Sequence, residues 1–399
     1  MFLPLVEPGG QLPVEEVARY SRHLLLPGIG TDGQRRLRNA RVLVVGAGGL
    51  GSPILLYLAG AGVGTIGVVD DDVVEESNLQ RQLVHGRTDL GRAKVDSAAE
   101  AVVRANPDVT VERHHERLTA HNALDLLKGY DLVLDGTDSF DTRYLVNDAC
   151  AILGKPYVWG SIFRFHGQIS VFWADPPTLA DGTSVAGVTY RDLHPEPPPA
   201  GLVPSCGEGG VLGALCGVIG SAMATEAVKL ICGVGEPLLG RVLVFDALAA
   251  QWRTLAVRPA PTAIRVTSLL DADATPPAGP DPAQAPSELA PTELARMLAS
   301  RERGEGDFLL IDVREPAERA IVDIPGAVGV PIDRFRGGDG VLEVQSLAAG
   351  RRVILYCKSG ARSAEALAVL TAAGLPDAAH LSGGVLAWID DVDPGLPRY

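Results

Sequence analysis

The hydrophobic pattern of the chain alternates between short apolar runs and longer amphipathic stretches. An amphipathic stretch at residues 15–26 predicts a first helix. From Arg41 onward, apolar or β-branched runs predict strands at 42–45, 65–69, 109–111 and 131–134. Helices are predicted between them, at 53–61, 94–104 and 122–128. This alternation of strands and helices is typical of a parallel α/β sheet.

The pattern after residue 150 completes this unit and then predicts a second one. Further strands are predicted at 157–159, at 168–173 and as a closing pair within 241–257. Residues 175–204 are rich in Pro, Gly and Asp and predict a long crossing loop, whereas 211–231 predict a buried helix.

A Pro-, Ala- and Asp-biased stretch at 273–291 predicts a semi-extended linker before a second α/β unit. This second unit has predicted strands at 308–313 and 353–356 and a predicted helix at 363–373. We therefore expect a first domain at residues 1–260, a linker at 261–286 and a smaller domain at 287–399.

The composition agrees with two soluble domains. The chain has 399 residues, 46% of them hydrophobic and 21% charged, which is ordinary for globular proteins but too long for one core. A net charge of −14 argues against nucleic acid as a partner. The longest apolar stretch, 211–224, is too short to span a bilayer, and the N-terminus lacks a signal pattern. We expect no membrane association and a cytoplasmic location.

A glycine-rich loop follows the first predicted strand. In the sequence Gly46-Ala47-Gly48-Gly49-Leu50-Gly51, Gly46 permits a tight turn, Gly48 lets the backbone approach phosphate and Gly51 allows close helix packing. Asp70 closes the next strand and can accept hydrogen bonds from both ribose hydroxyls. An NAD-dependent oxidoreductase would show the same features.

The loops that follow favour a triphosphate and a metal instead. They place an amide, two cations and a strand-end carboxylate at one edge of the sheet: Asn78, Arg81, Lys94 and Asp138. Arg81 and Lys94 can neutralise phosphate oxygens, and Asp138 can hold Mg²⁺ against the α-phosphate during attack by a carboxylate. We expect Asp71 and Asp72 to form a solvated acidic turn.

A lone cysteine leaves a predicted strand near the end of the chain. Cys357 is followed by Lys358-Ser359-Gly360-Ala361-Arg362, a charged loop that opens a predicted helix. Amides at a helix N-terminus and the Arg362 guanidinium both favour negative charge, which would lower the pKa of the thiol and hold a bound persulfide. The alternative is a buried core cysteine.

These motifs resemble known families. The segment 13–258 resembles the MoeB/ThiF family of adenylyltransferases, relatives of ubiquitin-activating enzymes, through Arg19-Tyr20-Ser21-Arg22, the glycine loop, Ser77 to Gln82, Asp138 and Pro204-Ser205-Cys206. The segment 287–399 resembles rhodanese sulfurtransferases. The whole chain is similar to fused adenylyltransferase–sulfurtransferases of actinobacteria and eukaryotes. The resemblance implies an α/β fold, with a Rossmann-like adenylation domain followed by a smaller rhodanese domain.

The resemblance also implies a set of site residues. ATP, with Mg²⁺, would be bound by Gly46, Gly48, Gly49, Gly51, Asp70, Ser77, Asn78, Arg81, Lys94, Asp138 and Ser139. Arg22 would reach the ATP site of a neighbouring subunit in a homodimer, unless it is a solvated helix charge. Cys206 would be the thiol that bonds to the activated partner, and the remaining cysteines, Cys150, Cys216 and Cys232, would be core residues.

Two features of the sequence depart from the families. Rhodaneses brace the loop with Asp and Arg, here Asp312 and Arg314, which could equally form a surface ion pair, and Asp323 replaces a common histidine. Many ThiF relatives bind zinc through two Cys-x-x-Cys pairs, but none of the five cysteines here forms such a pair. We therefore expect no structural zinc and no disulfide framework.

The implied substrate is a ubiquitin-fold sulfur carrier ending in Gly-Gly, of the MoaD, ThiS or CysO kind. Its C-terminus would be adenylated and then converted to a thiocarboxylate by a persulfide on Cys357, for molybdenum cofactor, cysteine or thiamin pathways. The sulfur donor would be a cysteine desulfurase or thiosulfate. A carrier-binding adenylyltransferase with a vestigial rhodanese module is the main alternative.

Overall fold

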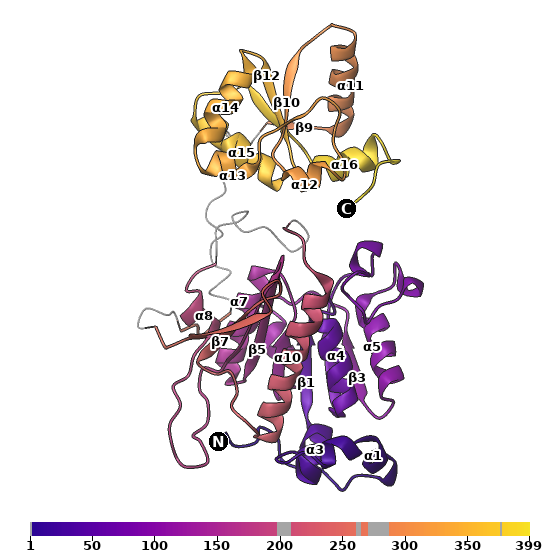
Figure 1. The fold of residues 1–399 in the computed structure, drawn as a ribbon, viewed down its shortest axis with the longest axis vertical. Helices are drawn as coiled ribbons and strands as arrows, with labels where there is room; N and C mark the ends of the chain where they lie inside the picture. The colour runs from indigo at the N-terminus through magenta and orange to yellow at the C-terminus, as the bar shows by residue number, and fades with distance from the viewer. Residues whose placement is uncertain (1, 198–208, 261–264, 270–286, 376) are drawn as a thin grey trace. The chain divides into compact units, whose positions relative to one another are not determined.

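The computed structural model describes residues 2–197, 209–260, 265–269, 287–375 and 377–399. The described chain forms two compact units, the first ending at residue 269 and the second beginning at residue 287 (Figure 1). The predicted linker at 261–286 lies almost wholly outside the described residues, and the domain boundaries given above stay predictions.

The first unit is built on one mixed sheet. Its strands are β1 (Arg41–Val45), β2 (Thr65–Val69), β3 (Thr110–His114), β4 (Leu132–Asp135), β5 (Tyr157–Phe163), β6 (His166–Phe172), β7 (Arg241–Asp246) and β8 (Gln251–Ala256). Their order is β3-β2-β1-β4-β5-β6-β7-β8. The first five strands, β1 to β5, are parallel. The strand that follows, β6, is antiparallel to β5, because Arg164, with a φ of 54°, turns the chain directly back.

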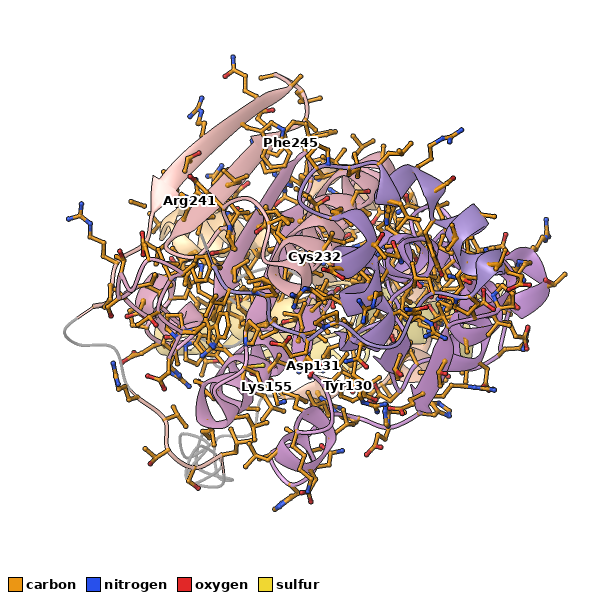
Figure 2. All side chains as sticks on the ribbon, turned by 90° about the horizontal axis from the view of Figure 1, so that it is seen from below. Tyr130, Asp131, Lys155, Cys232, Arg241 and Phe245 are labelled. Atoms are coloured by element: carbon orange, nitrogen blue, oxygen red, sulfur yellow. The ribbon has the colours of Figure 1, made fainter. Side chains whose placement is uncertain are left out.

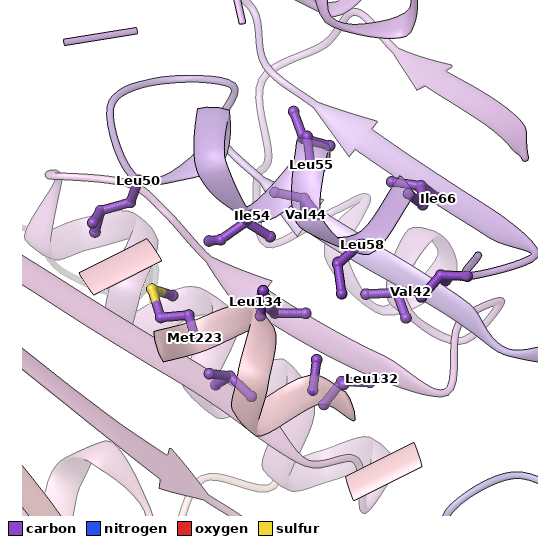
Figure 3. Close-up of a cluster of buried hydrophobic side chains, with 14 of the residues drawn as sticks. Val42, Val44, Leu50, Ile54, Leu55, Leu58, Ile66, Leu132, Leu134 and Met223 are labelled. Carbon is purple, nitrogen blue, oxygen red and sulfur yellow. The ribbon is translucent and has the colours of Figure 1, made fainter. Parts of the chain in front are cut away.

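Helices cover both faces of this sheet. The helices of this unit are α1 (Val14–Arg19), α2 (Ser21–Leu24), α3 (Gly30–Asn39), α4 (Gly51–Ala61), α5 (Lys94–Ala105), α6 (Ala123–Leu127), α7 (Phe140–Leu153), α8 (Tyr190–Leu193) and α10 (Gly213–Cys232). Successive side chains of a strand point to opposite faces. Val42 and Val44 of β1 therefore pack with α4 and α10 in one core cluster (Figure 3), and Leu43 and Val45 pack in a second cluster with α6 and α7.

Helix α10, with 20 residues, is the longest helix in the described part of this unit. By length and composition it could cross a membrane, but 61% of its most apolar window is buried in this unit, as in the core helix of a soluble protein. Glu226 and Lys229 interrupt its apolar sequence and pair with each other at 2.5 Å. The Glu226 carboxylate also accepts a hydrogen bond from the Leu238 amide at 2.9 Å, which compensates its burial.

The described part of the predicted crossing loop, residues 175–197, is held to α7 by side-chain contacts. The Arg191 guanidinium donates to both oxygens of Asp148, at 2.8 and 2.7 Å, and the Tyr190 amide donates to Asn147 Oδ1 at 2.7 Å. These contacts hold the segment through ion pairing and hydrogen bonding rather than through a cysteine pair. The absence of a structural zinc stays a prediction.

The amino ends of the parallel strands form the edge of the sheet opposite the glycine loop. Figure 2 shows Tyr130, Asp131 and Lys155 gathered there. The Lys155 ammonium donates to the Tyr130 carbonyl, and Asp131 accepts from the Arg41 amide at 2.8 Å. The Tyr130 carbonyl and the Arg41 amide at this edge therefore have partners within the unit, and the opposite, carboxyl edge carries the candidate site.

The second unit is a parallel five-stranded sheet. Its strands are β9 (Glu288–Leu289), β10 (Phe308–Asp312), β11 (Val328–Gly329), β12 (Arg352–Tyr356) and β13 (Ala378–Leu381), in the order β11-β10-β12-β13-β9. Its helices are α11 (Pro291–Glu302), α12 (Pro316–Arg319), α13 (Ile332–Arg336), α14 (Asp339–Ala348), α15 (Ala361–Ala372) and α16 (Gly384–Asp391). Separate core clusters lie on the two faces of the sheet, which identifies a three-layer α/β unit.

Candidate active sites

A cavity of the first unit lies where the strand order of the sheet reverses. Strand β1 is flanked by β2 on one side and by β4 on the other, so that the loops after β1 and β4 diverge and leave a crevice. The cavity has a volume of about 420 Å³. Its lining includes these predicted residues: Gly46, Gly48, Gly49, Asp70, Asn78, Arg81, Lys94, Asp138 and Ser139. Gly51 and Ser77 lie outside this lining.

The glycine loop is shaped by two close constraints. Gly46 has a φ of 88°, in the left-handed region that side chains disfavour. A Cβ atom on Gly51 would lie 2.0 Å from the Gly46 carbonyl oxygen. Any larger residue at Gly51 would therefore push α4 away from the loop, so Gly51 shapes the site without lining it.

Asp70 is held by the backbone around the cavity. Its Oδ2 accepts from the Ala47 amide at 2.8 Å, and its Oδ1 accepts from the Asp72 amide at 2.9 Å. Burial raises the pKa of Asp70, while the nearby Lys94 charge opposes this rise. Asp70 thus anchors the glycine loop, and each of its oxygens retains a lone pair that a hydroxyl donor could use.

The two predicted cations of the cavity, Arg81 and Lys94, come from the segment between β2 and β3. Lys94 begins α5 and is only 6% exposed, and its Nζ lies 2.7 Å from the exposed carboxylate of Asp72. Asp71 and Asp72 are exposed as predicted for a solvated turn, although Asp72 also holds this ion pair. Arg81 donates through Nη1 to the Ser77 carbonyl at 2.9 Å, so Ser77 acts on the site by orienting Arg81.

The loop after β4 supplies the remaining predicted groups. Asp138 is exposed and lines the cavity, where its carboxylate offers the hard oxygen ligands that Mg²⁺ prefers. Ser139 caps α7, since its hydroxyl accepts from the Thr142 amide at 3.4 Å. Arg22 is exposed on α2 and lies outside the lining of this cavity.

Arg143 and His85 are among the residues at this site that were not predicted from the sequence. Arg143 lies one turn into α7, is 5% exposed, lines the cavity and donates to the Thr137 carbonyl at 3.1 Å. His85 is buried beside the glycine loop, with Nε2 2.9 Å from the Ala47 carbonyl and Nδ1 2.9 Å from Ser97 Oγ. The position of Arg143, a cation in the first turn of the helix after a strand-end Asp, could have predicted it as a site residue. The place of His85 beside the glycine loop depends on packing and has no sequence pattern.

The candidate sulfur site lies at the carboxyl end of β12. Cys357 is 1% exposed, and its Sγ accepts from the Gly360 amide at 3.1 Å and from the Ser363 hydroxyl at 3.5 Å. Cys357 is thus buried beside apolar residues, as the alternative predicted, and its sulfur also faces two hydrogen-bond donors. Cys150, Cys216 and Cys232 are buried, as predicted for core residues, and Cys206 lies outside the described residues.

The charged groups around the sulfur loop form ion pairs. Arg362, which was predicted to stabilise a sulfur anion, donates to both oxygens of Glu318, at 2.8 and 2.7 Å, and its role toward the sulfur stays a prediction. The physical reason for the pairing is that a buried guanidinium needs a carboxylate partner. Asp312 and Arg314, predicted as a brace or a surface pair, are 2.6 Å apart and both fully buried, so they do not form a surface pair.

Comparisons with known proteins agree with this geometry. Residues 20–266 match the model of the ThiF family, and residues 291–391 match that of the rhodanese-like domain. The "Probable adenylyltransferase/sulfurtransferase MoeZ" of Mycobacterium tuberculosis is 55% identical over 99% of this chain and 98% of its own length. The "Sulfur carrier protein adenylyltransferase" of Thermus thermophilus is 52% identical over 62% of this chain and 89% of its own length.

A solved structure supports the fold of the first unit. The microcin C7 biosynthetic enzyme MccB, in complex with N-formylated MccA, aligns with a TM-score of 0.51 and 21% identity over 63% of this chain and 76% of that chain. The Mycobacterium tuberculosis relative, which matches over almost its full length, is named for adenylyltransferase and sulfurtransferase activities. These activities exclude the alternative of an NAD-dependent oxidoreductase. The chain belongs to the ThiF family and carries a rhodanese-like domain after it, which makes it an adenylyltransferase and sulfurtransferase.

Proposed function

We propose that the chain activates the C-terminal carboxylate of a ubiquitin-fold sulfur carrier protein with ATP and converts it to a thiocarboxylate. The observation that carries this proposal is the Cys357 sulfur, which faces the Gly360 amide and the Ser363 hydroxyl in a chain whose other unit is an adenylyltransferase. The name of the Thermus thermophilus relative supports a sulfur carrier as the substrate.

In the first step, a carboxylate oxygen of the carrier attacks the α-phosphorus of ATP. The bond to the β-phosphate breaks, pyrophosphate leaves, and an acyl-adenylate forms. Lys94 and Arg81 neutralise phosphate oxygens in the cavity, and Asp70 accepts hydrogen bonds from the ribose. Asp138 would hold Mg²⁺, which supplies positive charge to the phosphates when bound.

In the second step, sulfur passes through Cys357. With thiosulfate as donor, the Cys357 thiolate takes the sulfane sulfur and sulfite leaves, which gives a persulfide. The terminal sulfur attacks the acyl carbon and AMP leaves, which gives an acyl disulfide. A second thiolate then attacks the Cys357 sulfur, the S–S bond breaks and the thiocarboxylate is released. Cys206 is our candidate for this thiolate, and a cellular dithiol then reduces the resulting disulfide.

The remaining parts of the proposal concern assembly and location. We propose a homodimer in which Arg22 contributes to the partner subunit's ATP site, because it is exposed and lies outside the lining of its own cavity. Persulfide chemistry needs reduced thiols, so we place the reaction in the cytoplasm. Carriers of the MoaD, ThiS and CysO kinds are the candidate substrates.

Pyrophosphate exchange tests the division of labour between the two units. Asp138→Ala should abolish carrier-dependent exchange between ATP and pyrophosphate, because the Mg²⁺ ligand is lost. Cys357→Ala should leave exchange intact, because adenylation precedes sulfur transfer. Normal exchange in the Asp138 variant would refute the role of Asp138. If Cys357→Ala also leaves thiocarboxylate formation intact, the second unit is vestigial.

A further inference from the structure

Two ion pairs flank the sulfur loop, and one side chain joins them. Asp312 and Arg314 form one pair, and Glu318 and Arg362 form the other, at 2.6 and 2.7 Å. The hydroxyl of Tyr399 lies between the pairs. It accepts from Arg314 Nη1 at 2.5 Å and donates to Glu318 Oε1 at 3.4 Å. Buried charges of alternating sign are therefore connected through a neutral group.

The ring of Tyr399 makes a second contact with the loop. The ammonium of Lys358, the residue after Cys357, lies 4.6 Å from the ring centroid. The Arg314 guanidinium lies 5.8 Å from the same ring and 5.3 Å from that of Tyr356. Cations at these distances from aromatic rings are electrostatically stabilised. Tyr399 thus contacts Lys358 directly and Arg362 through Glu318, and both cations belong to the loop that carries Cys357.

The hydroxyl is suited to this position because it accepts one hydrogen bond and donates another. Burial raises the pKa of Tyr399 to about 12, against the opposing effect of Arg314, so the hydroxyl keeps its proton at neutral pH. Phenylalanine would keep the ring but lose both hydrogen bonds. Alanine would also uncover Lys358.

We propose that Tyr399 is a positioning residue for sulfur transfer. By joining the two ion pairs and contacting Lys358, it holds the Cys357–Arg362 loop in the geometry in which the Gly360 amide meets the Cys357 sulfur. It acts through other residues, and this role rests on the proposed function of Cys357 as the sulfur acceptor.

The test uses the full chain, with thiosulfate as donor and cyanide as acceptor. Tyr399→Phe should lower kcat by about 3- to 10-fold, in line with the net contribution of a typical hydrogen bond, and Tyr399→Ala should lower it further. Alkylation of Cys357 by iodoacetamide over a range of pH, followed by peptide mass analysis, gives a reactivity profile of the thiol. Its reactivity at neutral pH should fall in both variants, because a displaced Gly360 amide stabilises the thiolate less.

Controls separate positioning from folding and from the proposed function. Arg398→Ala perturbs the neighbouring residue, which pairs with Asp390 at the surface, and should change neither kcat nor the alkylation profile. Exchange of pyrophosphate into ATP should stay normal in all three variants. Cys357→Ala must abolish sulfur transfer; if it does not, the proposed function fails. If Cys357→Ala does abolish transfer, two results for Tyr399→Phe would refute the positioning role. One is a wild-type kcat and alkylation profile, and the other is a loss of activity only in proportion to a loss of folded protein.

Discussion

The backbone amide of Gly360 donates a hydrogen bond to the sulfur of Cys357 at 3.1 Å. Gly360 has a φ of 104°, a conformation that a residue with a Cβ atom rarely adopts, so the turn that aims this amide depends on glycine. The Ser363 hydroxyl, 3.5 Å from the same sulfur, is a second donor. Donors of this kind stabilise a sulfur anion more than a neutral thiol.

Removing the second donor should weaken sulfur transfer. In Ser363→Ala the sulfur keeps the Gly360 amide alone, so we expect the rate from thiosulfate to cyanide to fall about 3- to 10-fold. The rate at which iodoacetamide alkylates Cys357 at neutral pH should also fall. Thr371→Ala is the matched control, because Thr371 is on the same helix and donates only to the Leu367 carbonyl among its described bonds. Wild-type rates of sulfur transfer and of Cys357 alkylation in Ser363→Ala would refute the donor role.

Lys94 should be essential for adenylation. It is buried at the cavity with an exposed carboxylate as its ion-pair partner, so its charge is available to phosphate oxygens. We expect Lys94→Met to lower carrier-dependent pyrophosphate exchange by a factor on the order of 10²–10³, as for loss of one preorganised transition-state donor. Lys128→Met, at an exposed lysine paired with Asp125, should have no effect. Exchange within about twofold of wild type in Lys94→Met would contradict the assignment, because a twofold change is far smaller than the expected loss.

Stability near the glycine loop should depend on pH through His85. Burial lowers the pKa of His85 below its ordinary value, and the nearby Lys94 charge adds to this effect. Since the unfolded chain binds the proton more readily, the neutral imidazole contributes stability above about pH 6.5 that is lost as the pH falls below that value. Thermal unfolding at a series of pH values should show a smaller loss on acidification in His85→Gln. The exposed His115→Gln should behave as wild type, and equal slopes in all three proteins would contradict this account.

A shared ATP site would allow two inactive proteins to complement each other. In a mixture of Arg22→Ala and Asp138→Ala proteins, some heterodimers would contain one site with both residues intact, so pyrophosphate exchange should return. Tagged pull-down must first show that the subunits exchange. If subunits exchange and activity does not return, Arg22 acts within its own chain or not at all.

The strands could be predicted closely where apolar runs are sharply bounded. The predicted strand 65–69 has the same bounds as β2, because Gly64 and Asp70 end the run on either side. Helix α3 was not predicted, because its sequence Gly-Thr-Asp-Gly-Gln-Arg-Arg-Leu-Arg-Asn has two glycines and a single large apolar residue, Leu37. Its stability comes from burial of Leu37 and Gln34 against the rest of the unit, which no local pattern reveals.

The candidate site was predictable where it follows strands. The carboxyl ends of parallel strands share one edge, so Gly46, Asp70 and Asp138 could be brought together from the strand pattern alone. The pairing of Arg362 with Glu318 could not be predicted, because Glu318 belongs to α12, which follows β10, a different strand from β12, the one that precedes Cys357. The contact of Tyr399 with the sulfur loop depends on how the last segment packs, for which the sequence has no periodic signal.

The most direct test of the proposed function is the mass of the carrier protein after reaction. A candidate carrier is incubated with the full chain, ATP, Mg²⁺, a dithiol and thiosulfate as the sole sulfur source, and its intact mass is measured. We predict that one oxygen is replaced by one sulfur with the wild-type chain, and that Asp138→Ala gives no product. Cys357→Ala should support adenylation, measured as pyrophosphate exchange, without giving thiocarboxylate. Full conversion of the carrier by Cys357→Ala would contradict the account.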